Sequence, residues 1–110
     1  MINKIKDDSV DFLFKSILQL KSVDECYAFF EDLCTVPELK AMSQRIVVAH
    51  MLKNKRVYSD IVARTGASTA TISRVNRSLN YGEGGYDLAF GRMTPKELYI
   101  KSVEENKEEN

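Results

Sequence analysis

Short hydroxyl side chains and arginines occur together between residues 68 and 77, and this mixture suits contacts with a nucleic acid. Hydroxyls and the free amides at a helix start can meet phosphates or base edges, and an arginine one turn later can reach guanine O6 and N7 or a phosphate. The candidate DNA-contacting residues are Ser68, Thr69, Ala70, Thr71, Arg74 and Arg77, with the basic residues Arg64 and Lys55 beside them. Asp60 stands four residues before Arg64, the spacing of a helical ion pair, which makes Arg64 a weaker candidate than Arg74.

Charge is unevenly distributed along the chain, although the net charge is zero. Residues 53–77 hold six lysines and arginines against one carboxylate, a net charge of +5, so the rest of the chain carries −5. A basic block in an otherwise acidic chain is typical of a phosphate-binding surface. The alternative is an ordinary solvated helix surface.

The other reactive side chains predict no catalytic or metal centre. Cys26 and Cys34 are about 12 Å apart along a predicted helix, too far for a disulfide, and we interpret them as small core hydrophobes. His50 is the only histidine and has no second ligand at metal spacing. Without paired carboxylates or a nucleophile beside a histidine, we predict that the protein is not an enzyme.

Helix start signals divide the N-terminal half of the chain into three predicted helices. Asp8 or Ser9 can cap the first. The second begins at Ser22, which has the capping-box partner Glu25, and runs to about Cys34. A second capping box, Thr35 to Glu38, opens a third helix that reaches Lys53. Its predicted inward-facing residues are Leu39, Met42, Ile46, Val47 and Met51.

Shorter elements follow. We predict helices over residues 57–64 and 68–79, then a turn at the three glycines of residues 82–85, because glycine destabilises a helix interior and no Lys-Ser/Thr follows them as in a phosphate-binding loop. A short helix over residues 86–90 and a last helix opened by the Thr94 capping box come next. The expected organisation is one all-α domain, residues 1–110, with dimerisation helices in 1–53, a helix-turn-helix in 57–79, a glycine-rich loop in 80–85 and C-terminal helices in 86–106.

Composition suits a soluble globular protein, since 44% of residues are hydrophobic and 29% are charged. No signal peptide or membrane anchor is visible, so we predict a cytoplasmic location. No apolar run approaches the roughly 20 residues of a membrane span, and we predict no membrane association. The first three helices carry large apolar side chains, including Phe12, Phe14, Phe29 and Phe30, that a chain of 110 residues has few partners to cover. We therefore predict a homodimer, with a complete monomeric bundle as the alternative.

Residues 58–79 match the requirements of a helix-turn-helix. Such a unit needs a first helix with a buried aliphatic residue, a glycine at the turn and a second helix that packs through its own aliphatic side chains. Ile61 and Val62 meet the first requirement, and Gly66 can adopt the positive φ of the turn. The packing face of the second helix is formed by Ala67, Ile72 and Val75.

Several runs of this sequence resemble the Trp repressor superfamily. They are Leu33-Cys34-Thr35 and Ala41-Met42-Ser43-Gln44-Arg45, followed by Gly66-Ala67-Ser68-Thr69-Ala70-Thr71-Ile72-Ser73-Arg74 and Asn76-Arg77-Ser78-Leu79. The later Leu79-Asn80-Tyr81-Gly82 and Gly84-Gly85-Tyr86 are similar to the YerC/YecD-type branch. The resemblance spans roughly residues 20–90. It implies an intertwined all-helical dimer whose two recognition helices enter successive major grooves, about 34 Å apart.

The resemblance also bears on an effector. In the Trp repressor a threonine, two arginines and a serine hold the amino acid, and they match Thr35, Arg45, Arg74 and Ser78 here. The glycine that follows the second arginine there is Val75 here, and its branched side chain would intrude where the ligand approaches the backbone. We therefore predict no cofactor, with tryptophan or another amino acid as the alternative. For Arg45, an ion pair with Glu38 or a neighbouring acid is as good an interpretation as a ligand contact.

The sequence thus predicts a DNA-binding transcriptional regulator that reads the major groove of double-stranded DNA as a homodimer. The resemblance implies a repressor. An alternative from another class is a helical adaptor that docks an acidic protein partner through the same basic face.

Overall fold

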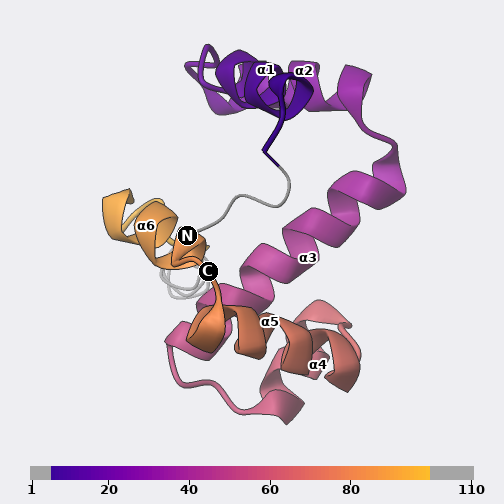
Figure 1. Cartoon of the computed structure of the whole chain (residues 1–110). Coiled ribbons are helices and arrows are strands. Elements are labelled where there is room, and N and C mark those ends of the chain that lie inside the picture. Colours follow the sequence, from indigo (N-terminus) through magenta and orange to yellow (C-terminus); the bar gives the residue numbers. More distant parts are fainter. Residues whose placement is uncertain (1–5, 100–110) are drawn as a thin grey trace. The chain divides into compact units, whose positions relative to one another are not determined.

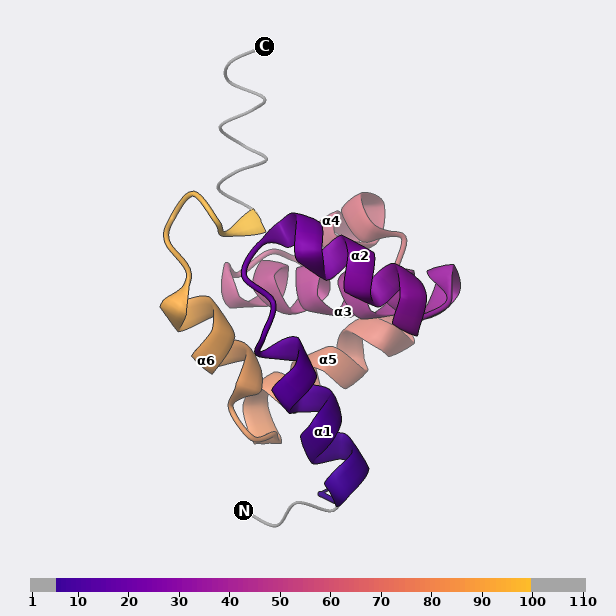
Figure 2. The same ribbon diagram turned by 90° about the horizontal axis from the view of Figure 1, so that it is seen from above.

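A computed structural model describes residues 6–99, and within that range the chain forms helices without any strand (Figure 1, Figure 2). The predicted all-α fold class is confirmed. The helices are α1 (Asp8–Ile17), α2 (Val23–Leu33), α3 (Val36–Lys53), α4 (Tyr58–Thr65), α5 (Thr69–Tyr81) and α6 (Gly85–Arg92).

The chain divides into two compact units, Met1–Lys40 and Ala41–Asn110. The division falls inside α3, so the first unit holds α1, α2 and the start of α3, and the second holds the rest. It does not coincide with the boundary expected after residue 53. The dimerisation role of residues 1–53 stays a prediction.

Side-chain caps fix the starts of α1, α2, α3 and α5. Thr35 and Glu38 form the predicted reciprocal box: the Glu38 amide donates to Thr35 Oγ1 at 3.2 Å and the Thr35 amide donates to Glu38 Oε1 at 2.9 Å. Hydrogen bonds from the Thr35 backbone and then from the Thr35 side chain to the carboxylate hold the pKa of Glu38 below its usual value, because they favour the charged form. At α1, the cap is Asp7 rather than Asp8 or Ser9, and it accepts from the Val10 amide at 2.8 Å.

The box at α2 is only partly as expected. The Glu25 amide donates to Ser22 Oγ at 3.1 Å, as predicted. The Glu25 carboxylate, however, accepts from the Lys21 amide at 2.9 Å instead of that of Ser22. The extended backbone of Ser22, with φ −150° and ψ 162°, precedes the helix, and the long glutamate side chain reaches one residue further back.

The first unit buries little of its apolar surface. No residue of α1 or α2 is fully buried, although Phe29 and Phe30 pack edge to face with ring centroids 5.5 Å apart. Phe12 is 73% exposed and Leu18 is 79% exposed. Cys26 and Cys34 are half-buried free thiols, not fully buried core residues. The unit therefore presents large apolar side chains to its surroundings.

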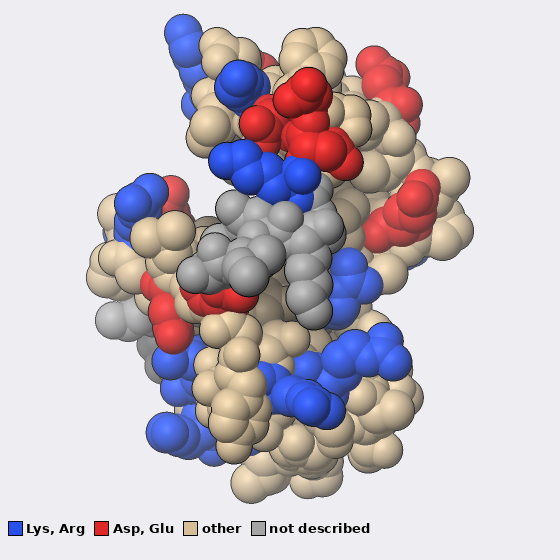
Figure 3. All heavy atoms as spheres, viewed as in Figure 1, with Lys and Arg blue, Asp and Glu red and all other residues tan. Residues whose placement is uncertain are grey.

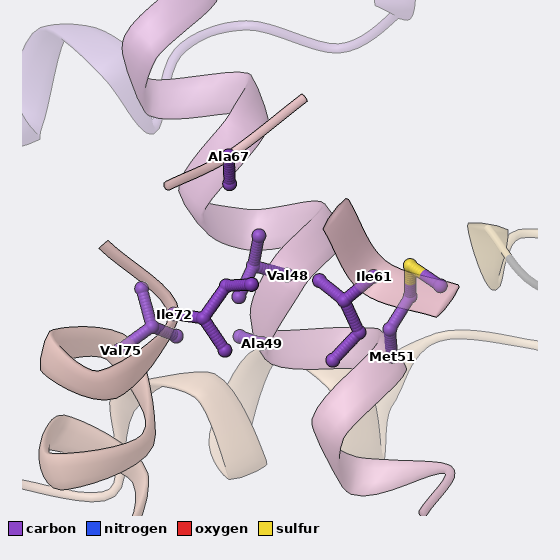
Figure 4. Close-up of a cluster of buried hydrophobic side chains, with 7 residues drawn as sticks. All are labelled: Val48, Ala49, Met51, Ile61, Ala67, Ile72 and Val75. Carbon is purple, nitrogen blue, oxygen red and sulfur yellow. The ribbon is translucent and has the colours of Figure 1, made fainter. Parts of the chain in front are cut away.

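The hydrophobic core belongs to the second unit, where α3 meets α4 and α5 (Figure 4). Its fully buried members are Val48, Ala49, Met51, Ile61, Ala67, Ile72 and Val75. The prediction of which α3 residues face inward was therefore wrong in part. Only Met51 of that set is fully buried, whereas Met42 is 37% and Ile46 is 39% exposed. The fully buried side chains of α3 lie only near its C-terminal end.

Helix α6 packs on the C-terminal end of α3. Phe90 meets the buried ring of His50 edge to face, with centroids 5.1 Å apart, and stacks on Tyr86 at 6.0 Å. Lys53 Nζ lies 2.7 Å from Asp87 Oδ1. Burial lowers the pKa of His50, since it penalises the charged ring. His50 is thus a core residue of this unit.

The predicted glycine-rich loop is shorter than expected, because α5 continues to Tyr81 and α6 already begins at Gly85. Gly84 takes φ 77° just before α6, a conformation that favours glycine. At Thr94 one bond of the predicted box is formed, since the Thr94 amide donates to Glu97 Oε1 at 2.8 Å, but the Glu97 amide donates to the Thr94 carbonyl at 3.0 Å. Residues 95–97 form a turn and not the start of the predicted last helix. The part of the predicted last helix beyond residue 99 lies outside the described residues.

Candidate nucleic-acid interface

The turn between α4 and α5 is built by Gly66. It ends α4 in the left-handed conformation, φ 70°, and its amide donates to the Val62 carbonyl at 2.9 Å. A side chain there would be strained by the positive φ. Ala67 follows and is buried, and Ser68 then caps α5 by accepting from the Thr71 amide at 3.1 Å. Helix α4, the turn at Gly66 and α5 thus follow one another, an order consistent with the helix-turn-helix unit predicted from the sequence.

Side chains on both sides of the turn hold it in place. Thr65 Oγ1 donates to the Ile61 carbonyl at 2.7 Å and accepts from the Ala67 amide at 3.1 Å. Gln44, on α3, donates from Nε2 to the Thr65 carbonyl at 3.1 Å. The turn is thus tied both to α4 and to the long helix behind it.

Helix α5 has a buried and an exposed face. Ile72 and Val75 enter the core, and the exposed face carries Thr69, Ala70, Ser73, Arg74 and Arg77. Ser73 was missed in the sequence, although it lies four residues after Thr69 and shares its face. Thr71 was chosen instead but is half-buried, and its hydroxyl accepts from Ser68 Oγ at 3.1 Å. Their helical positions relative to the buried pair, Ile72 and Val75, could have shown in the sequence that Ser73 is exposed and Thr71 is not.

The basic block separates into paired and unpaired cations. Lys53 pairs with Asp87, and Arg56 Nη1 lies 3.4 Å from Asp60 Oδ2. Asp60 therefore pairs with the residue four before it rather than with Arg64 four after it. Within residues 6–99 no ion pair is formed by the remaining cations of the block, Lys55, Arg64, Arg74 and Arg77. Figure 3 shows a group of Lys and Arg side chains on the surface of the second unit.

Lys55 occupies the turn between α3 and α4 with φ 62°, within the described residues the one residue other than glycine with a positive φ. Its amide donates to the Leu52 carbonyl at 3.0 Å, and the Arg56 amide donates to the Met51 carbonyl at 3.1 Å. This is the hydrogen-bond pattern of a Schellman helix end, a position that glycine usually takes. An exposed lysine is held there at a conformational cost.

The residues matched to an effector site are distributed over the two units. Thr35 belongs to the first unit, and its hydroxyl caps α3. Arg45, Arg74 and Ser78 are exposed residues of the second unit. The expected alternative for Arg45, an ion pair, is not formed within residues 6–99, where the Glu38 carboxylate accepts the Thr35 amide instead.

Val75 is 2% exposed and packs in the core (Figure 4). Its bulk therefore fills the interior between α3 and α5. That this side chain would intrude where an effector approaches the backbone stays a prediction.

No group of three or more His, Cys, Asp or Glu side chains in the described part of the chain could hold a metal ion. None of the helices there is both long enough and apolar enough to cross a membrane.

Comparisons with known proteins agree on one family. The family model described as Trp repressor protein matches residues 8–94. YerC of Bacillus subtilis, a protein of uncharacterised function, is 50% identical over 101 residues, which cover 92% of this chain and 97% of YerC.

Two solved structures are also similar. A TrpR-like protein from Eubacterium eligens has 59% identity and a TM-score of 0.79, and the match covers 83% of this chain and 94% of that one. A Staphylococcus aureus protein, provisionally assigned as a Trp repressor, has 49% identity and a TM-score of 0.79, covering 82% of this chain and 90% of its own.

Proposed function

Because this chain belongs to the Trp repressor family, we propose that it is a transcriptional regulator, a repressor, that binds double-stranded DNA as a homodimer in the cytoplasm. It acts by occupying a DNA site, so the mechanism requires binding and no covalent chemistry. The observation that carries the proposal is the exposed face of α5, on which Arg74 and Arg77 stand beside short side chains.

The shape of this face suits the major groove. A B-DNA major groove is about 12 Å wide and admits one α-helix. The start of α5 carries Ser68, Thr69 and Ala70, which are small enough to let the helix approach base edges. Arg74 lies at least one turn further along, where its guanidinium can bind guanine O6 and N7 as a bidentate donor.

The unpaired cations around this helix suit the phosphate backbone. Lys55 precedes α4, Arg64 lies in its last turn, and Arg77 lies one turn beyond Arg74. A lysine or arginine already paired with a carboxylate must give up that pair to bind phosphate, and these three have no such pair within residues 6–99. We propose that they neutralise phosphates, whereas Arg74 contributes to sequence preference.

The apolar surface of the first unit supports the dimer. Burying apolar surface stabilises by about 25 cal/mol per Å², and isolated monomers rarely leave large apolar patches in water. Phe12, Leu18, Val23 and Tyr27 are each at least 60% exposed in the single chain. A second copy would cover them, and it would place two α5 helices on successive turns of DNA.

An amino-acid effector is a further proposal that depends on the dimer. Thr35, Arg45, Arg74 and Ser78 are the candidate contacts, and Arg74 belongs to this set as well as to the DNA-contacting set. If an effector binds there, added tryptophan or another amino acid will change the affinity for DNA.

The first experiment is selection of random duplex DNA at about 0.15 M salt, where nonspecific backbone binding is already weakened. We expect a palindromic motif with half-sites about one helical turn apart. Arg74→Ala should relax the preference at one position of each half-site, at a cost of about 1–3 kcal/mol per site. The matched control is Arg92→Ala, which removes an exposed arginine from α6 and should leave the motif unchanged.

Enrichment of no motif, with and without amino acids, would contradict the proposal. The exposed basic face would then favour the adaptor function, with an acidic protein as partner. In that case Arg74→Ala would have no effect on DNA and would weaken the protein complex.

A further inference from the structure

We infer that Gln44 is a positioning residue that sets the orientation of α5 relative to α3, and through it the half-site spacing that the dimer accepts. This inference rests on the proposed DNA-binding function. Gln44 lies on α3, outside both the predicted DNA-contacting set and the predicted effector set. Its side chain spans to the far end of α4, 21 residues away in sequence, and donates from Nε2 to the Thr65 carbonyl at 3.1 Å.

The Thr65 carbonyl is a position where an external donor matters. It belongs to the last turn of α4, so the helix has no further amide that could donate to this carbonyl. The side chain of Gln44 is half-buried, so water replaces its hydrogen bond less readily than on an open surface. The donor is a side chain of α3, the helix that contributes Val48, Ala49 and Met51 to the core.

A second hydrogen bond links Thr65 to the residue just before the cap of α5. Thr65 Oγ1 accepts from the Ala67 amide at 3.1 Å, and Ala67 is buried immediately before the cap residue Ser68. Apolar packing of Ala67 in the core sets how close α5 lies to α3 but is not directional. A hydrogen bond is directional, so the Gln44 bond can fix the rotation of the turn.

Helix α3 has one face that packs against α4 and α5 and another that is exposed in the single chain. Gln44, Val48 and Met51 recur at spacings of four and three, so they share the face that meets α4 and α5. Met42 and Ile46 are spaced by four on another face and are more than a third exposed in the single chain. In the proposed dimer this second face is available to the partner copy, so one helix bears both the dimer contact and the contact with the recognition turn.

The test compares two glutamine variants of the full-length protein. Gln44→Met keeps the length of the side chain and removes its amide. Gln19→Met is the matched control, because Gln19 also donates from Nε2 to a backbone carbonyl, that of Lys15 at 3.2 Å, but within its own helix region. Each variant is measured for melting temperature, nonspecific affinity, affinity for the enriched palindrome, and affinity for palindromes lengthened or shortened by one base pair.

We expect Gln44→Met to lose about tenfold in specific affinity while keeping nonspecific affinity, and to discriminate less between spacings. Gln19→Met should behave as wild type. Wild-type spacing preference in Gln44→Met would overturn the inference. So would an equal loss of specific and nonspecific affinity accompanied by a lower melting temperature, because that pattern indicates stability alone.

Amide exchange in the free protein separates this inference from the proposed function. If the wild-type protein enriches no DNA motif, the proposed function fails and exchange alone decides the role of Gln44. Faster exchange of the Gly66 and Ala67 amides in Gln44→Met than in Gln19→Met supports the tether. Equal rates in the two variants overturn it.

Discussion

Replacing Lys55 with glycine should make the protein more stable and, at the same time, a weaker DNA binder. Lys55 has φ 62° and ends α3 with the hydrogen bonds of a Schellman motif. An L-residue in the left-handed region is strained by about 1–2 kcal/mol. Glycine removes this strain, but the variant loses about 0.5–1 kcal/mol of stability because glycine raises the conformational entropy of the unfolded chain.

The net gain is therefore about 0–1.5 kcal/mol per chain, and its middle value of about 0.75 kcal/mol raises the melting temperature by about 3–6 °C in a domain of this size. The effect on DNA has the opposite sign. Each phosphate contact contributes about 0.9 to the slope of log K against log salt. A dimer that loses two such contacts should show a slope shallower by about 1.8.

Thermal unfolding must be compared at equal protein concentration, because dimerisation makes the melting temperature depend on it. Lys55→Arg is the matched control, since it keeps both the charge and the strain and should retain the wild-type slope and melting temperature. If Lys55→Gly melts at or below the wild-type temperature, the strain argument is refuted. If its salt slope equals that of wild type, Lys55 does not lie at a phosphate.

Three further predictions concern other parts of the molecule. Burial lowers the pKa of His50 from 6.5, so its stabilising contribution is complete above pH 6.5 and is lost as the pH falls towards the lower pKa of the folded state. The melting temperature of wild type should fall over that range more than that of His50→Leu, and parallel curves would contradict the assignment. Arg64→Gln should make the salt slope of DNA binding shallower by about 1.8 per dimer, whereas Arg56→Gln should change it less because Arg56 already pairs with Asp60. Phe12→Ser should shift the protein from dimer to monomer in sedimentation velocity, because this ring is 73% exposed in the single chain; an unchanged dimer would place the interface elsewhere.

The sequence alone predicted most of the features that depend on local physics. The cap at Thr35 and the turn at Gly66 each depend on residues within four positions, and the structure has both where they were predicted. The α5 packing residues Ile72 and Val75 were also correctly identified, because a short amphipathic helix beside a turn has one apolar face to bury. The same local signals misplaced the first cap by one or two residues.

Tertiary structure decided which side chains are buried and which groups pair when the sequence offers more than one partner. Met42 and Ile46 have the helical spacing of core residues, yet the fully buried positions of α3 lie only near its C-terminal end. Asp60 could pair four residues forward or back, and it pairs with Arg56. The hydrogen bond from Gln44 to Thr65 joins residues 21 apart in sequence, and no periodicity in either helix predicts it. Burial and long-range pairing depend on how the helices pack, which is a property of all of them together, whereas a cap or a turn depends on a few neighbouring residues.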